Sequence, residues 1–249
     1  MRLRYFDYRY ASAVLNDEAF RVSKDELLQI LTQADAPLLS PDLEPGRGGV
    51  KRRSRSGGRG QPGSRYLFFP VDQRSLNHQL DGLFEANDWE LQPSIVRRDR
   101  GAGPDTGLKG DYKKGRLQVE AQFGNMARWY TDVFKFQLSY SLDEIDVAVL
   151  VVPSQRFANL IDENVAHFER VARELPWAKM SLTLPIWVIG IEPENYAPVR
   201  ECYEEAAANY VNSQAAVGRA VTAIPFDTRL IETRDQISGG GGSEIPHTA

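Results

Sequence analysis

Three polar side chains near the middle of the chain are of types that could hold a metal ion. Asp111 follows a glycine, and Glu120 and Gln122 stand further along the same stretch, GDYKKGRLQVEAQFGN. Apolar and polar residues alternate through 116–123, which predicts a strand with Glu120 and Gln122 on its polar face. A turn at 112–115 would form an antiparallel hairpin, which would bring Asp111 beside Glu120.

Two carboxylates at one edge of a sheet suit Mg²⁺, which keeps several waters and accepts a phosphate as a further ligand. Such an ion lowers the pKa of its bound water and neutralises charge on a phosphoryl group. Gln122 could then hydrogen-bond the attacking water. The alternative interpretation is a surface hairpin with solvated acids, and the spacing alone does not separate the two.

The composition sets limits on the class of protein. With 249 residues, 42% of them hydrophobic, the chain suits one large domain or at most two small ones. It has no apolar run of about 18 residues, so we expect no transmembrane helix, and MRLRYFDYRY lacks an apolar core of the signal-peptide kind. Cys202 is the only cysteine, which fits a reducing cytoplasm, and the three histidines lack zinc spacing.

Charge is unevenly distributed along the chain. The net charge is −4, yet residues 46–65 contain seven basic residues, seven glycines and no acid. This segment is either a solvated loop without a role or an arm that binds a phosphate backbone. A second basic, glycine-rich stretch covers 97–110. The arginines expected to bind DNA in the two stretches are Arg52, Arg53, Arg55, Arg97 and Arg98.

The remaining pattern predicts the elements that must position these residues. Apolar residues recur at helical spacing in three segments, 10–33, 73–88 and 157–175. The segment 126–141 is dense in aromatics at mixed spacing, and we expect it to form a buried helix. Near-continuous apolar runs at 146–153 and 184–193 predict strands covered on both faces. We therefore expect an α/β sheet with a right-handed crossover. Residues 1–238 would form a single domain with an inserted loop at 46–65, and 239–249 a disordered tail.

The motif G-D-x8-E-x-Q-F-G-N resembles the metal site of the BglII/BstYI family of type II restriction endonucleases. This family is a branch of the PD-(D/E)xK nucleases in which glutamine replaces the usual catalytic lysine. Further segments over roughly residues 1–195 resemble the family in the same order. They are FDYRYASAVLND, LFFPVDQRSLNHQL, IDVAVLVVP, HFERVAREL and LPIWVIGIEP.

The resemblance implies a restriction-endonuclease-like fold, with a central mixed sheet flanked by helices. It also implies a homodimer that cuts palindromic double-stranded DNA with Mg²⁺, beside a cognate DNA methyltransferase. Asp111 and Glu120 would be the metal carboxylates, with the backbone carbonyl of Ala121 as a third ligand. Gln122 would position the water, because an amide cannot act as a general base near neutral pH.

Base readout is expected at two places. Asn125 directly follows the catalytic strand, where family members reach the inner bases, although a turn asparagine is the alternative. The second place is 154–164, which contains Arg156 and Asn164. Acidic residues occupy this segment, where family members carry small residues with hydroxyl side chains. The resemblance implies a GATC core, and the acidic residues lead us to expect an outer base pair different from that of the relatives. Helix capping by Asp162 or Asn164 is the alternative.

Other functions stay open at this stage. The chain could be a non-specific or repair nuclease of the same superfamily, or a DNA-binding relative without catalysis. The intact acidic motif argues against the latter. A small-molecule enzyme with an aromatic pocket at 129–140 is a third possibility, although aromatics at helical spacing usually belong to a core. If the protein is a dimer, we expect the segment 126–142 to help form it.

Overall fold

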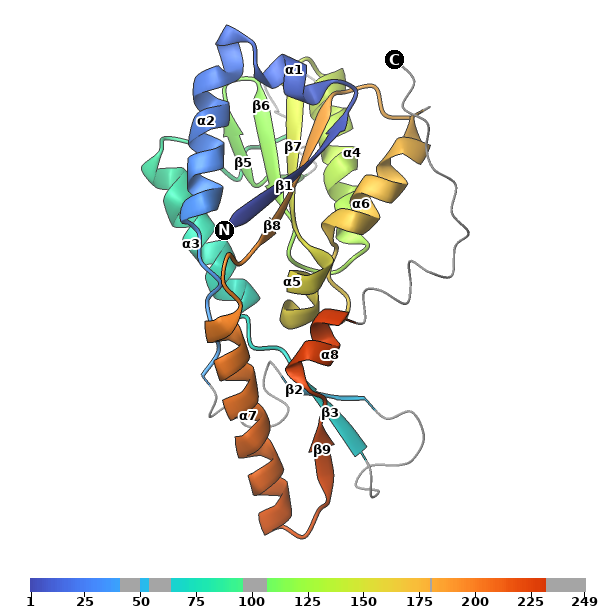
Figure 1. The fold of residues 1–249 in the computed structure, drawn as a ribbon. Helices are drawn as coiled ribbons and strands as arrows, with labels where there is room; N and C mark the ends of the chain where they lie inside the picture. The colour runs from blue at the N-terminus through green and yellow to red at the C-terminus, as the bar shows by residue number, and fades with distance from the viewer. Residues whose placement is uncertain (41–49, 54–63, 96–106, 180, 232–249) are drawn as a thin grey trace.

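A six-stranded mixed sheet forms the centre of the molecule, with helices on both of its faces (Figure 1). The computed structural model describes residues 1–40, 50–53, 64–95, 107–179 and 181–231. The strand order is β1-β8-β7-β6-β5-β4, in which β6, β7 and β8 are parallel and the outer pairs antiparallel. The strands are β1 (Arg2–Tyr8), β4 (Glu90–Leu91), β5 (Tyr112–Lys114), β6 (Leu117–Ala121), β7 (Val147–Pro153) and β8 (Ile186–Glu192). The expected fold class is confirmed.

Strand β7 shows why the sequence contains unbroken apolar runs. All of its residues are buried, and successive side chains point to opposite faces of the sheet. Val147, Val149 and Val151 pack in the core beneath α2 (Glu18–Gln33) and α3 (Gln73–Ala86). The even-numbered residues pack beneath α4 (Arg128–Ser141) and α6 (Phe168–Glu174). Each face therefore has its own hydrophobic core.

Two of the expected helices are each divided. The segment 10–33 forms α1 (Ala11–Leu15) and then α2, because the Asp17 side chain accepts a hydrogen bond from the Ala19 amide and starts a new helix. The segment 157–175 forms α5 (Gln155–Ile161) and α6, followed by the 3₁₀ helix η2 (Leu175–Ala178). A single helix across 157–175 was wrong because Val165 makes a β-bridge with Asn125.

A second, smaller sheet lies at one end of the molecule (Figure 1). It contains β2 (Val50–Arg53), β3 (Ser64–Phe68) and β9 (Val221–Ala223), beside α7 (Ala197–Ala216) and α8 (Phe226–Ile231). The basic segment 46–65 is therefore not a loop throughout, since β2 pairs with β3. Arg55, Arg97, Arg98 and the tail 239–249 lie outside the described residues. Within the described ranges, no helix is long and apolar enough to cross a membrane.

Candidate active site

The acidic motif lies on the hairpin of β5 and β6. Tyr112 pairs with Val119 and Lys114 with Leu117, so Gly115 and Arg116 form the turn. This turn is shorter than the expected one at 112–115, because residues 112–114 continue the strand. Gly115 has φ 59°, a left-handed conformation that suits glycine. The register places Asp111 opposite Glu120.

One hydrogen bond joins Asp111 to Glu120, and a second joins Asp111 to Ala121. The backbone amide of Asp111 donates to Glu120 Oε1 at 3.2 Å, and Asp111 Oδ2 accepts from the Ala121 amide at 2.9 Å. Gln118 Nε2 also donates to Glu120 Oε1, at 2.9 Å. The structure thus brings Asp111, Glu120 and Ala121 together at one end of the hairpin.

Gly110 makes this approach possible. A Cβ atom at this position would stand 2.9 Å from both Gln118 Nε2 and Glu120 Oε1, and 3.2 Å from Pro93 Cγ. Real Cβ contacts are essentially never that short. The glycine before Asp111 is therefore required by the close passage of the backbone against the Glu120 carboxylate.

Helix α4 supplies two further charged side chains. Lys135 Nζ donates to Glu120 Oε2 at 2.5 Å and lies 2.9 Å from Asp132 Oδ1. Asp132 Oδ2 accepts from Gln122 Nε2 at 2.8 Å, and Gln122 Oε1 accepts from the Gly124 amide at 2.8 Å. Neither Asp132 nor Lys135 was predicted from the sequence as a site residue. Their signal was a charged pair at i, i+3 in a helix otherwise rich in aromatic residues.

Burial dominates the electrostatics of the acid pair. Glu120 is fully buried; this burial, followed by the charge of Asp111, raises its pKa to about 8 despite the opposing effect of Lys135. Burial also raises the pKa of Asp111, although the Ala121 amide opposes that shift. For Lys135, burial would lower the pKa, but Glu120 and Asp132 outweigh it, so the pKa rises and the ammonium stays charged.

Two neighbouring carboxylates, one half-buried and one fully buried, are costly to ionise together unless a cation offsets their charge. Their oxygens are the hard ligands that divalent ions such as Mg²⁺ prefer, so the residues present fit such an ion. Among the described residues, no group of three or more histidines, cysteines and acids is arranged to hold a metal. An ion here would therefore take its other ligands from the backbone, water and substrate.

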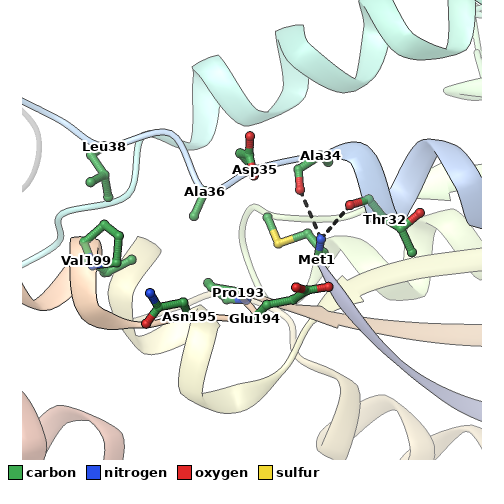
Figure 2. A pocket seen from close by; sticks show the side chains of 11 residues that line it. Met1, Thr32, Ala34, Asp35, Ala36, Leu38, Pro193, Glu194, Asn195 and Val199 are labelled. Carbon is green, nitrogen blue, oxygen red and sulfur yellow. Dashed lines mark hydrogen bonds between the residues drawn. The ribbon is translucent and has the colours of Figure 1, made fainter.

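The acidic hairpin borders a hollow of about 470 Å³ between β6, α3 and α4. Its walls include Asp111, Ala121, Gln122, Asp132 and Lys135, together with Gln73, Asn77, Asp81 and Arg128, which the sequence analysis did not single out. A second hollow, of about 400 Å³, surrounds the N-terminus (Figure 2). There the Met1 ammonium donates to the carbonyls of Thr32 and Ala34 at 2.8 and 3.2 Å (Figure 2). No residue of the acidic hairpin lines this second hollow.

The two expected readout segments lie side by side. The Met126 amide donates to the Asn164 carbonyl at 2.8 Å, and the Ala166 amide donates to the Gly124 carbonyl at 3.2 Å. Asn125 and Asn164 are both exposed. Asn125 also has a turn role, because its Oδ1 accepts from the Ala127 amide at 2.9 Å.

The other predicted contacts lie elsewhere. His167 is the N-cap of α6, so the alternative interpretation, in which Asp162 or Asn164 caps this helix, was wrong. Arg156 is exposed on α5, with its guanidinium 5.2 Å from the ring centroid of Tyr196, and it does not line the hollow. Arg52 and Arg53 lie on β2.

The mixed sheet with helices on both faces has the fold of a restriction endonuclease, as a comparison with solved structures shows. The structure of the restriction endonuclease BglII complexed with a DNA 16-mer matches it with a TM-score of 0.57 and 17% identity, over 79% of this chain and 78% of that one. A structure of free BglII matches with a TM-score of 0.49 and 16% identity, over 78% and 81% of the two chains. No curated protein matches the chain.

The family model described as restriction endonuclease BglII/BglIII matches residues 3–191. The chain therefore belongs to this family of restriction endonucleases, which are site-specific deoxyribonucleases. The resemblance found in the sequence is confirmed.

Proposed function

We propose that this restriction endonuclease uses Mg²⁺ to hydrolyse phosphodiester bonds within a short palindromic site that has a GATC core. The contact of Asp111, which lines a hollow bordered by α3 and α4, with the buried Glu120 is the observation that carries the proposal. The bound ion would supply Lewis-acid stabilisation of the phosphoryl group and a water of lowered pKa. Asp111, Glu120 and the carbonyl of Ala121 would hold it.

Gln122 has an oriented amide. Its oxygen accepts from Gly124, and one of its two N–H groups donates to Asp132, so one N–H remains to orient a water. An amide does not take up a proton near neutral pH. We therefore assign Gln122 to positioning the water, and the released proton goes to solvent or to a phosphate oxygen.

Double-stranded DNA is the proposed substrate, which agrees with the DNA bound to the similar BglII structure. The adjacent, exposed Asn125 and Asn164 support a role in reading base edges in the major groove, where an amide suits adenine. Phosphate contacts are assigned to the basic stretches, through the arginines Arg52, Arg53, Arg55, Arg97 and Arg98, and to Arg156.

A homodimer is proposed because a palindromic site offers one scissile bond per strand to two equivalent active sites. Exposed aromatic side chains support a contact through α4 and the neighbouring η2: Tyr130 is 48%, Phe134 60% and Trp177 84% exposed. Tyr130 also donates to Glu174 Oε2 at 2.5 Å, which ties α4 to α6. A cognate methyltransferase, and a location in the cytoplasm, follow from the need to protect host DNA.

Digestion of a plasmid in Mg²⁺, with run-off sequencing of the ends, tests the proposal. We expect discrete ends within palindromes that contain GATC. Cuts at sites without GATC would refute the proposed GATC core. A smear would favour a non-specific nuclease. Asp111→Ala should bind DNA without cutting it, and Glu192→Gln, which alters a buried carboxylate outside the hollow, should cut normally. DNA binding without cleavage by the wild type would favour the inactive relative.

A further inference from the structure

Strand β6 and the residue that follows it, Gln122, offer no positive charge to a substrate. Gln122 is neutral, and both ends of its amide have partners, Gly124 at the oxygen and Asp132 at the nitrogen. The carboxylates Asp81, Asp111 and Asp132 line the same hollow. A phosphodiester entering this hollow meets several acids, so its own charge needs a cation besides the divalent ion.

Lys135 brings such a charge from the facing helix. Its ammonium is held by Glu120 Oε2 at 2.5 Å and by Asp132 Oδ1 at 2.9 Å, and the residue lines the hollow beside Asp111, Ala121 and Gln122. A lysine has three N–H donors, and these two carboxylates account for two of them. The third is available to an oxygen bound in the hollow.

The position of this ammonium is fixed on two sides. Glu120 is fully buried and Asp132 nearly so, and the Lys135 side chain is only 14% exposed. A cation held in this way needs little reorganisation when charge develops on a substrate, which is the arrangement that makes electrostatic stabilisation effective.

We propose that Lys135 is a catalytic residue, whose ammonium contacts the scissile phosphate and stabilises the charge that develops there. The inference rests on the nuclease function proposed above. Asp132 is its positioning residue, and it also orients Gln122. The active-site ammonium thus comes from α4, while the residue directly after β6 is the neutral Gln122.

Kinetics of Lys135→Met test this role, with Lys135→Arg as the conservative variant and Lys113→Met as the matched control. Lys113 is 13% exposed and pairs with Glu144, but it does not line the hollow. Removal of one preorganised donor costs about 100-fold to 1000-fold in kcat. For Lys135→Met we expect that loss in kcat, with KM unchanged within about threefold. Lys135→Arg should recover kcat by at least about tenfold relative to Lys135→Met. Lys113→Met should cleave at the normal rate.

A binding experiment tests the contact itself without turnover. Duplexes with and without a methylphosphonate at the mapped scissile position are bound in Ca²⁺. Neutralising that phosphate should weaken binding by the wild type and by Lys113→Met. For Lys135→Met, the methylphosphonate should weaken binding by a factor at least about threefold smaller than in the wild type, because this variant has no ammonium that contacts the phosphate. Equal losses in all three proteins would overturn the contact.

Mn²⁺ titration by calorimetry separates this role from a structural one. An ammonium near the ligand oxygens repels the ion, so Lys135→Met should bind Mn²⁺ at least as tightly as the wild type. Weakening beyond about fivefold would mean that Lys135 only organises the ligands, and it would overturn the proposal. If Lys135→Met does not fold, Lys135→Gln takes its place. Cleavage at the wild-type rate by either variant would also overturn the proposal. A wild type that fails to cut would instead refute the nuclease function.

Discussion

Gly110→Ala perturbs the acid pair without replacing either acid. The new Cβ atom would stand 2.9 Å from Glu120 Oε1 and from Gln118 Nε2, against ordinary contacts of 3.4 Å or more. These atoms must therefore retreat by about 0.5 Å. Both belong to buried side chains that hydrogen-bond each other, so the carboxylate cannot yield without changing its place in the site.

The expected cost falls mainly on activity. Extra volume in a packed interior costs about 1–3 kcal/mol, and we expect the lower end because side-chain tips, not backbone, give way. A misplacement of about 1 Å at a reacting centre can cost about 100-fold in rate. For half that movement we expect kcat/KM to fall by about tenfold.

The assay is a single-turnover cleavage of a short duplex, with thermal unfolding measured beside it. Gly82→Ala on α3 is the matched control, because a Cβ there meets nothing within 4 Å. It should stabilise the helix by up to about 1 kcal/mol and leave cleavage unchanged. If Gly110→Ala cuts at the wild-type rate while remaining folded, the close packing of Gly110 on Glu120 does not matter for catalysis.

Three other predictions concern the sheet, the α6 terminus and the dimer. Gly190→Ala would place a Cβ 2.7 Å from the Phe168 ring, so we expect a loss of about 2–3 kcal/mol, seen as a Tm lower by about 6 °C. Burial opposes ionisation of Glu169, but His167, backbone amides and Arg4 lower its pKa to about 2. Glu169→Gln should therefore lower the free energy of unfolding, measured in urea at pH 7, by about 1 kcal/mol. This difference should vanish as the pH falls from about 4.3 towards 2, and a difference independent of pH would contradict the reasoning. Phe134→Ser should shift sedimentation from dimer to monomer, and an unchanged dimer would move the interface elsewhere.

The parts of the fold that the sequence predicted are those with a repeating local pattern. The apolar runs at 146–153 and 184–193 became β7 and β8, because strands covered on both faces have no polar positions. The acids were expected to meet because alternation and a turn fix the register of a hairpin. Strand β1 had no such signal, since most of its side chains are exposed or half-buried on the sheet edge.

The rest depends on contacts between elements distant in the sequence. Residues 162–167 leave the helix because they run beside 124–126, a pairing that no local pattern records. Lys135 and Asp132 reach Glu120 and Gln122 only because α4 packs on the sheet. Their spacing on one helix face was visible in the sequence, but their partners were not.

The central claim is that Asp111 and Glu120 together bind the divalent ion that the reaction needs. Calorimetric titration of Mn²⁺ into the wild type, Asp111→Asn, Glu120→Gln and the control Glu192→Gln tests it directly. We predict one site in the wild type and in the control, weakened at least about tenfold by either change in the pair. Identical isotherms for all four proteins would contradict the account.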